Sequence, residues 1–312
     1  GFLEGMATLE ERNWITHSTI ISGDINIKNN KTDNTDHIII GAANAVIDGF
    51  TIRNGGDSDY TAADTEINSF GGGLYVSEIG MASMKVANCT FLENNVYYED
   101  GDEMPTTGKG GAIFVTNSAL EIVHCSFIDN RAWQRGGALF IMNPPGPDSY
   151  PIVISNSVFR DNCTRMGSVA NQVGGGAIWA DAGYLDVTDT EFIKNRAGIN
   201  DLVNGSGAAI HLPRGGSGTD HVKFTRCIFV NNQTGSGQGG GIFANRNVIV
   251  EDSLFTQNRC HTRARGGGIF VAHGITATVK DSVFSANSCY QNANFYTWGM
   301  DGNLEQGQGA AI

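Results

Sequence analysis

Two short motifs alternate along most of this 312-residue chain, and their repetition constrains the fold more than any other feature. The first is a pair of small residues followed by an aliphatic and usually an aromatic residue, as in Gly111-Ala112-Ile113-Phe114. The second is Phe-x-x-Asn, which follows each copy of the first, with successive Phe residues 26 to 37 positions apart. Seven such pairs in the same order indicate a repeat architecture.

Each repeat is expected to contain three short strands. Between the two motifs, apolar residues such as Leu120 and Ile122 alternate with other residues, which places their side chains on one face of a strand. Strands this short cannot bury a face alone, so stacked repeats are needed to enclose one core. The sequence therefore predicts an all-β fold, a right-handed parallel β-helix of three sheets and about nine to eleven coils stacked ~4.8 Å apart.

We interpret residues 1–312 as a single β-helix domain, with looser coils in 1–70 and regular coils in 71–312. In the looser part, Phe50 and Asn54 stand four positions apart instead of three. The chain begins without Met, and its last four residues repeat the start of a unit, so we expect a fragment of a longer chain. Differences in repeat length are expected to be surface loops, within 95–110, 142–151, 163–175, 213–221 and 288–309.

The Asn of the second motif is predicted to occupy the same corner in every coil. At equivalent corners, its side-chain amide can bond the amides above and below it, which satisfies turn groups that the sheets cannot reach. This structural Asn ladder is expected to comprise Asn94, Asn130, Asn162, Asn195, Asn232, Asn258 and Asn287.

The charge of the chain excludes one class of partner. There are 32 acidic against 20 basic side chains, a formal net charge of −12, so no nucleic acid is expected as the main partner. No run of 18 or more apolar residues occurs, so we expect no direct membrane insertion by this segment. The first residues also lack the basic and apolar stretches of a signal peptide.

Gly-Gly-Ala-Ile coupled to Phe-x-x-Asn resembles the repeat of the chlamydial polymorphic outer-membrane proteins and related proteins of environmental bacteria, over roughly residues 71–312. The resemblance implies an extracellular or cell-surface β-helix, often a passenger region used for adhesion, with its anchor elsewhere in the full protein. The motif is a packing signature, so it indicates architecture and names no catalytic residue.

An aromatic column is the most suggestive candidate for ligand binding. Because the flanking aliphatic residues should point inward, alternation directs the aromatic side chains outward. Such a ladder is either a platform for sugar rings or an apolar partner, or a stack that lies under the loops and serves stability alone. Its members are Tyr75, Phe114, Phe140, Trp179, His211, Phe243 and Phe270.

The six Cys residues fit either small buried thiols or a disulfide framework. Cys89, Cys125 and Cys227 lie two residues before a repeat Phe and are expected to be buried. Cys260 and Cys289 occupy the same position in adjacent repeats and are the best disulfide candidate. No pair has the Cys-x-x-Cys spacing of a zinc site.

Acidic residues follow the repeat Phe by two positions at Glu93, Asp129 and Asp161, on consecutive coils. Stacked carboxylates repel one another unless a cation or a basic side chain separates them, so these are weak candidates for a Ca²⁺ site. The alternative is that they are solvated surface acids. No other cofactor is indicated.

The sequence favours a secreted or cell-surface module that acts without catalysis in adhesion, with glycans or another cell-surface protein as partners. One alternative is a polysaccharide lyase or glycoside hydrolase of the β-helix type. Its candidate groups, His211 near Arg214 and the pair Asp181 and Asp186, do not converge in the sequence, so no catalytic residue is assigned. The other alternative is a subunit of an extracellular fibre or sheath, built by end-to-end self-association of open coils.

Overall fold

The computed structural model of the protein describes residues 8, 12–14, 16–25, 34–56, 70–96, 108–143, 150–165, 173–198, 205–215, 220–261 and 265–289. Across these ranges the chain forms strands and turns with no helix, and therefore no helix long and apolar enough to cross a membrane. Every strand pair is parallel. This all-β, parallel arrangement is consistent with a parallel β-helix.

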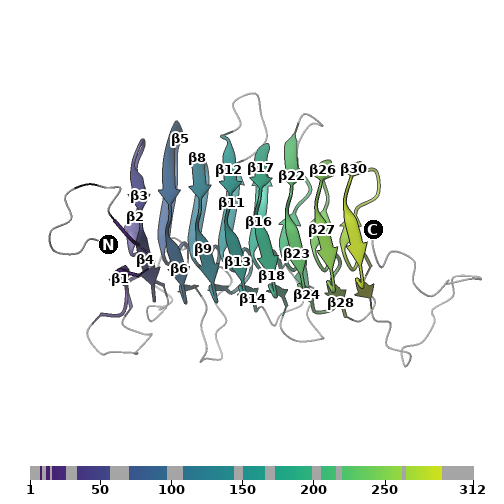
Figure 1. The fold of residues 1–312 in the computed structure, drawn as a ribbon, viewed down its shortest axis with the longest axis horizontal. Helices are drawn as coiled ribbons and strands as arrows, with labels where there is room; N and C mark the ends of the chain where they lie inside the picture. Colours follow the sequence, from purple (N-terminus) through teal and green to yellow (C-terminus); the bar gives the residue numbers. More distant parts are fainter. Residues whose placement is uncertain are drawn as a thin grey trace, which may run out of the picture.

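Three long sheets run along the molecule (Figure 1). The Phe sheet, which carries the repeat Phe, has nine strands: β1 (Thr19–Ser22), β4 (Phe50–Arg53), β6 (Thr90–Leu92), β9 (Ser126–Ile128), β13 (Val158–Arg160), β18 (Glu191–Ile193), β23 (Ile228–Val230), β27 (Leu254–Thr256) and β31 (Val283–Ser285). The narrow sheet has seven two-residue strands: β7 (Asn95–Val96), β10 (Arg131–Ala132), β14 (Cys163–Thr164), β19 (Arg196–Ala197), β24 (Gln233–Thr234), β28 (Arg259–Cys260) and β32 (Ser288–Cys289).

The wide sheet contains the small-residue motif and the alternating strand of each coil. Its 14 strands are β2 (Ile39–Ile40), β3 (Val46–Asp48), β5 (Leu74–Ala87), β8 (Ile113–Val123), β11 (Leu139–Asn143), β12 (Ile152–Ser155), β16 (Ile178–Ala182), β17 (Tyr184–Thr188), β21 (Ile210–Leu212), β22 (His221–Thr225), β25 (Ile242–Ala244), β26 (Val248–Glu251), β29 (Ile269–Val271) and β30 (Ala277–Lys280). A separate pair joins β15 (Val173–Gly174) to β20 (Gly205–Ser206).

The assignment of strands to sheets differs from the prediction. The strand of the small-residue motif and the alternating strand were expected to form separate sheets. Both belong to the wide sheet, because β5 and β8 each continue through the corner between them. One end of β8 pairs with β11 and the other with β12. The third long sheet is the narrow sheet, whose two-residue strands follow the ladder Asn and were missed. The repeat start expected at 309–312 lies outside the described residues.

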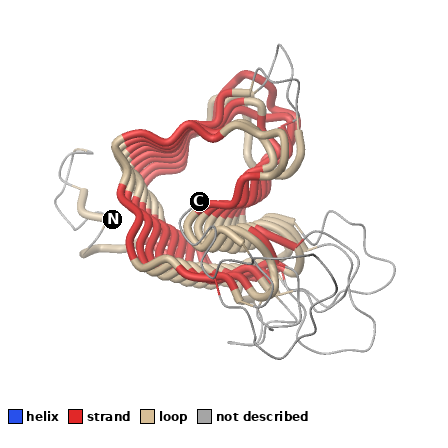
Figure 2. The backbone as a smooth tube through the Cα atoms, turned by 90° about the vertical axis from the view of Figure 1, so that its right-hand side faces the viewer, coloured by secondary structure: helices blue, strands red, loops and turns tan. Residues whose placement is uncertain are grey.

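The chain turns at corners where one residue adopts a left-handed backbone conformation. In the coil that contains β8 and β9 these residues are Gly110, His124 and Asp129, with φ angles of 65°, 52° and 49°. At Gly110 a Cβ atom would also stand 2.2 Å from the carbonyl oxygen of Ile113, so this corner accepts only glycine. Because each coil turns at equivalent positions, successive coils lie one behind another (Figure 2).

The core is a set of columns in which each side chain meets its counterpart in the next coil. Six pairs of Phe rings stack at centroid distances of 4.3 to 5.1 Å, which matches the spacing of the strands. Aliphatic residues from the wide sheet, such as Ile113, Leu120 and Ile122, complete this core. The Phe column comprises Phe91, Phe127, Phe159, Phe192, Phe229, Phe255 and Phe284.

The Asn side chains form a continuous ladder of hydrogen bonds. Each Nδ2 donates to the Oδ1 of the next Asn at 2.9 to 3.0 Å, from Asn94 to Asn287. Each Nδ2 also donates to a backbone carbonyl of the preceding coil, as Asn162 does to Phe127. Each Oδ1 accepts a backbone N–H as well, as Asn162 does from Asn130. The buried amides are thereby satisfied on both sides.

In the first coils, residues other than Phe50 and Asn54 continue the Phe column and the Asn ladder. Ile52, not Phe50, pairs with Phe91 and continues the Phe column. Gly55, not Asn54, donates its N–H to Asn94 Oδ1 and takes the place of the ladder Asn. A Cβ atom on Gly55 would stand 2.0 Å from the carbonyl oxygen of Gly72, so the ladder ends where no side chain fits.

Replacement of one rung tests how much the ladder stabilises the coils. Asn162→Ala removes the acceptor for two donors of Asn130 and the donor to Phe127, all of them buried. We expect the free energy of unfolding, measured by urea denaturation, to fall by about 2–4 kcal/mol. The control is Asn231→Gly, at a half-buried corner with a φ of 54° that glycine adopts freely. Equal losses in the two variants would contradict a special role for the ladder.

Candidate functional site

The predicted aromatic column exists on the outer side of the wide sheet. Its seven residues pair in register from one coil to the next. Neighbouring rings stack, with centroid distances of 4.6 to 6.3 Å. The four central side chains are nevertheless buried, with exposed fractions of 3% for Phe114, 1% for Phe140, 5% for Trp179 and 3% for His211. Tyr75, Phe243 and Phe270 are half-buried.

Chain segments that precede the glycine corners cover the centre of the column. Lys109 Nζ lies 4.7 Å from the ring centroid of Phe70 and 5.7 Å from that of Phe140, and the guanidinium of Arg135 lies 5.0 Å from Trp179. Of the two interpretations of this column, the covered stack describes the central rings, while ligand binding at the partly exposed ends stays a prediction. The cover is held together by parallel bridges through Phe70, Lys109, Arg135 and Gly174.

His211 is the imidazole member of the column. Its Nδ1 lies 3.1 Å from the carbonyl oxygen of Ser206, and a Cβ atom on Gly174 would stand 2.3 Å from that nitrogen, so the cover fits closely over the ring. Burial, with smaller effects from Arg135 and Arg246, lowers the pKa of His211 to about 4. The imidazole is therefore neutral at pH 7 and serves the stack rather than acid–base chemistry at the surface.

Two of the three acidic residues proposed for Ca²⁺ form ion pairs with basic side chains. Glu93 forms an ion pair with Arg53 at 3.3 Å, and Asp129 forms one with Arg131 at 3.1 Å. Each of the three, Asp161 included, occupies a left-handed corner. Over the residues that the structure describes, no group of three or more His, Cys, Asp or Glu side chains is arranged to hold a metal ion. A Ca²⁺ site here stays an untested prediction.

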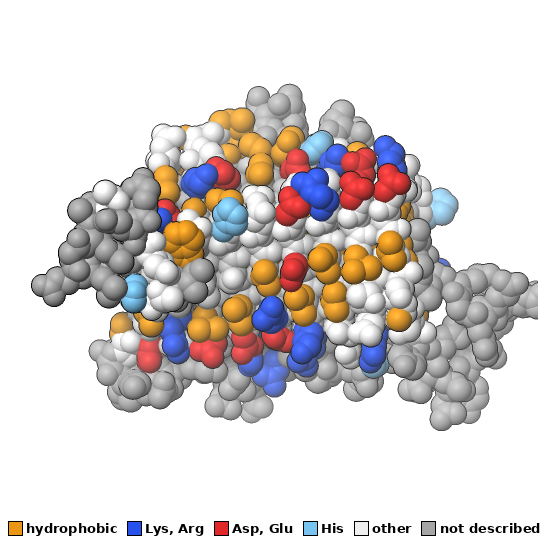
Figure 3. Space-filling model, viewed as in Figure 1, with side chains coloured by type: hydrophobic (Ala, Val, Ile, Leu, Met, Phe, Trp, Pro, Cys, Tyr) orange, Lys and Arg blue, Asp and Glu red, His pale blue; other side chains and the backbone are white. Residues whose placement is uncertain are grey.

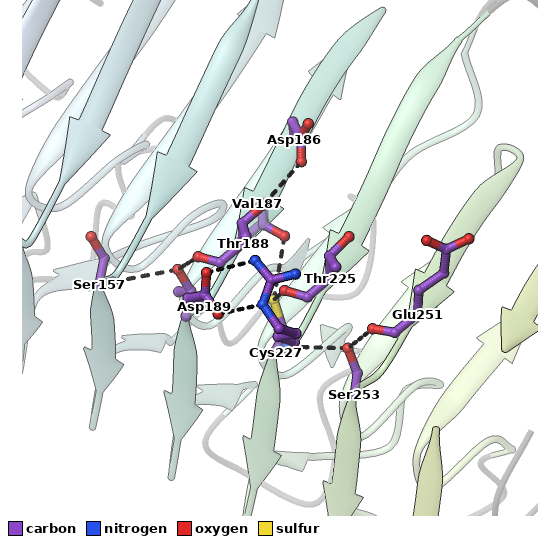
Figure 4. A network of polar contacts seen from close by, with 11 residues as sticks. Ser157, Asp186, Val187, Thr188, Asp189, Thr225, Cys227, Glu251 and Ser253 are labelled. Carbon is purple, nitrogen blue, oxygen red and sulfur yellow. Dashed lines mark hydrogen bonds and ion pairs between the residues drawn. The ribbon is translucent and has the colours of Figure 1, made fainter. Parts of the chain in front are cut away.

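Cys227 belongs to a second ladder, made of small residues two positions before the repeat Phe (Figure 4). Its N–H donates to Ser253 Oγ at 3.0 Å, and its thiol donates to the carbonyl oxygen of Thr225. Ser253 Oγ donates in the same way to the carbonyl oxygen of Glu251. Burial raises the pKa of Cys227 to about 12, so it is a structural thiol. The recurrence of Ser, Thr and Cys at this position was the sequence signal for the ladder, and it was interpreted only as small size.

The predicted disulfide is absent, because all six cysteines are free thiols in the structure. Cys260 and Cys289 do pair in register on β28 and β32. Side chains at paired positions of adjacent parallel strands point the same way, which is unfavourable for a disulfide. The thiol of Cys260 instead donates to the carbonyl oxygen of Gly266 at 3.3 Å.

A buried ionic cluster was missed by the sequence analysis. Arg246 lies in the turn before β26, and its side chain is 1% exposed. Its guanidinium donates to the carbonyl oxygens of Pro213 and Ala182 and pairs with Asp181, and it lies 3.5 Å from Asp220. Burial raises the pKa of Asp220, although Arg246 acts in the opposite direction.

This cluster links three coils. Asp181 lies on β16, Pro213 follows β21 and Arg246 follows β25, so one guanidinium joins successive layers. The Asp220 side chain is only 3% exposed, which excludes direct contact with a polysaccharide in this conformation. Of the two carboxylates considered for hydrolysis, Asp181 pairs with Arg246, whereas Asp186 lies 3.8 Å from His221. The two proposed carboxylates therefore have different partners.

The outer side of the Phe sheet is a surface that the sequence analysis did not consider. Its rows are formed by the residues directly before and after each repeat Phe, and hydrophobic side chains gather along it (Figure 3). We call this surface the aliphatic face. It comprises Thr90, Leu92, Ser126, Ile128, Val158, Arg160, Glu191, Ile193, Ile228, Val230, Leu254, Thr256, Val283 and Ser285.

Comparison with known proteins finds similarity to two of them. The chain is 28% identical over 219 residues to the probable autotransporter YfaL of Escherichia coli (strain K12), covering 63% of this chain and 16% of that protein. It is 26% identical over 198 residues to metabotropic glutamate receptor-like protein R of Dictyostelium discoideum, covering 64% of this chain and 10% of that protein. No family model and no solved structure matches. The chain thus spans less than a fifth of either relative, and the narrower resemblance to chlamydial repeats stays a prediction.

Acid should destabilise the protein through His211. Its pKa is about 4 in the folded chain against an ordinary value of 6.5, so below pH 6.5 the unfolded chain binds a proton that the folded chain does not. Stability is lost as the pH falls from 6.5 towards 4, by up to about 3 kcal/mol at ~1.4 kcal/mol per pKa unit. Denaturation over this pH range measures the loss.

His211→Phe, which keeps a stacked ring, should remove most of that pH dependence. A smaller pH dependence should remain in this variant, because burial also lowers the pKa of His37. His124→Asn, at an exposed left-handed corner, is the control. A steep acid loss that persists unchanged in His211→Phe would contradict the assignment.

Proposed function

We propose that this chain is a right-handed, three-sheet parallel β-helix that forms the passenger region of a larger secreted or cell-surface protein and adheres to another surface without catalysis. The similarity to a probable autotransporter supports export. The in-register stack of coils carries the proposal, because it produces a rigid rod with long faces of repeated side chains. Such faces suit contact with an extended partner.

The distribution of side chains supports a protein partner more than a glycan. The aromatic rings that would stack on sugars are buried at the centre of their column. The outer side of the wide sheet carries ion pairs between adjacent strands, such as Lys85 with Glu121 and Lys223 with Glu251. The aliphatic face, by contrast, presents partly exposed Ile, Leu and Val side chains, which is the surface chemistry typical of protein contacts.

Adhesion is tested by displaying the 312-residue chain on a non-adherent bacterial strain and measuring retention on a layer of cultured epithelial cells. We expect Ile193→Lys with Val230→Lys, on the aliphatic face, to lower retention by about tenfold or more. Val153→Lys, on the outer side of the wide sheet where Val153 is 37% exposed, is the matched control. Equal retention of all three strains would contradict adhesion through this face.

Catalysis is tested in parallel with the purified chain. Glycan-array binding and assays for reducing ends and unsaturated products on acidic polysaccharides, with and without Ca²⁺, are run on the same sample. We expect no product, because the adhesive function needs no turnover. Product formation that Asp181→Asn abolishes would overturn the proposal in favour of a polysaccharide-degrading enzyme.

A further inference from the structure

The aliphatic face consists of two rows that flank the Phe column. Val158, Glu191, Ile228, Leu254 and Val283 pair in register in the row before the Phe. The row after the Phe contains Leu92, Ile128, Arg160, Ile193 and Val230. Most of these side chains are half-buried by their own neighbours, and Val283 is 59% exposed. The face is therefore a flat strip of aliphatic groups that remains partly open to water.

One basic and one acidic side chain interrupt this strip. Arg160 on β13 lies in the row after the Phe, and Glu191 on the adjacent strand β18 lies in the row before it. Elsewhere, outward charges pair across strands, as Asp189 does with Arg226 at 2.7 Å. Arg160 and Glu191 form no ion pair with each other or with any other residue of the described ranges. The strip thus carries two opposite charges without ion-pair partners among the described residues.

We propose that a second copy of this chain is the partner that covers the aliphatic face. The two copies pack face to face about a two-fold axis that runs along the solenoid, between the two rows. This inference goes beyond the proposed function, because the contacted protein is another molecule of the same kind on the same surface and not a component of the second surface. Such a contact is isologous, so each residue of the interface is used twice.

The positions of the two charges fit this symmetry. An axis along the solenoid exchanges the rows and keeps each coil level with its counterpart. Arg160 of one copy then faces the row that contains Glu191 of the other, one strand spacing away, or ~4.8 Å, which its long side chain can bridge. Two such ion pairs form. Each joins Arg160 of one copy to Glu191 of the other, and neither residue has an ion-pair partner among the described residues of its own copy.

The energetics also favour a like partner. Packed sheets exclude water from aliphatic rows, and each apolar side chain that becomes buried contributes favourably. The formal net charge of −12 makes two copies repel each other at a distance, so a self-contact requires a face without net charge. With one Arg and one Glu, the aliphatic face meets this condition. The two solenoids point in the same direction, as two molecules displayed on one surface do.

Charge exchange distinguishes a second copy from an unrelated apolar partner. Sedimentation equilibrium of the purified chain is compared for the original sequence, Arg160→Glu, Glu191→Arg and the double variant, with circular dichroism as the check on folding. We expect a concentration-dependent dimer whose Kd rises about tenfold or more in each single variant, because like charges then meet. The double variant should return to within about threefold of the original value, since the pairs re-form with reversed polarity.

Two further variants complete the test. Ile193→Lys should abolish the dimer, and Val153→Lys should leave it unchanged. A monomer at every concentration, a double variant as weak as the singles, or an equal effect of Val153→Lys would overturn the inference. If the chain is monomeric but still adheres to epithelial cells through the aliphatic face, the self-contact is overturned and the proposed function stands.

Discussion

The stacking of identical side chains in successive coils is the interaction on which the rest of the structure depends. An Asn amide has one donor group and one acceptor, so it satisfies the amides above and below only when all of them occupy the same corner. The adjacent Phe rings impose the same spacing through their stacking distance. Register is therefore specified twice in each coil, once by polar and once by apolar contacts, and a slip by one residue would break both.

That repetition explains which features followed from the sequence. The Phe and Asn columns consist of one residue type at a constant position, and the aromatic column keeps one kind of ring residue in nearly every coil, so their motifs indicate their place. The narrow sheet has strands of two residues, too short to show a period. Continuity of the wide sheet depends on backbone angles at a corner, where β8 continues but β11 ends at Asn143. Motif spacing indicated the loop expected within 142–151, where β11 ends, but not that β8 continues through the same corner.

The candidate sites were harder to predict for a related reason. The cover over the aromatic column uses Phe70, Lys109, Arg135 and Gly174, four different residues at one structural position. Arg246 bridges residues about 30 and 65 positions away, which no local pattern connects. Period-2 alternation correctly directed the aromatic side chains away from the solenoid core, but it does not distinguish an outer surface from a second buried layer.

The outward rows follow from the same constraint as the core. Once each Phe is aligned with the next, the residues on either side of it are aligned as well, whatever their chemistry. Internal packing therefore leaves these positions free to vary, and water contact alone would favour polar residues there. Strand propensity and contacts along each row account for part of their Ile, Leu and Val content, and the part that they leave unexplained is the surface that stays open to water. An apolar strip with a single pair of opposite charges is instead the composition expected of a surface that another protein covers.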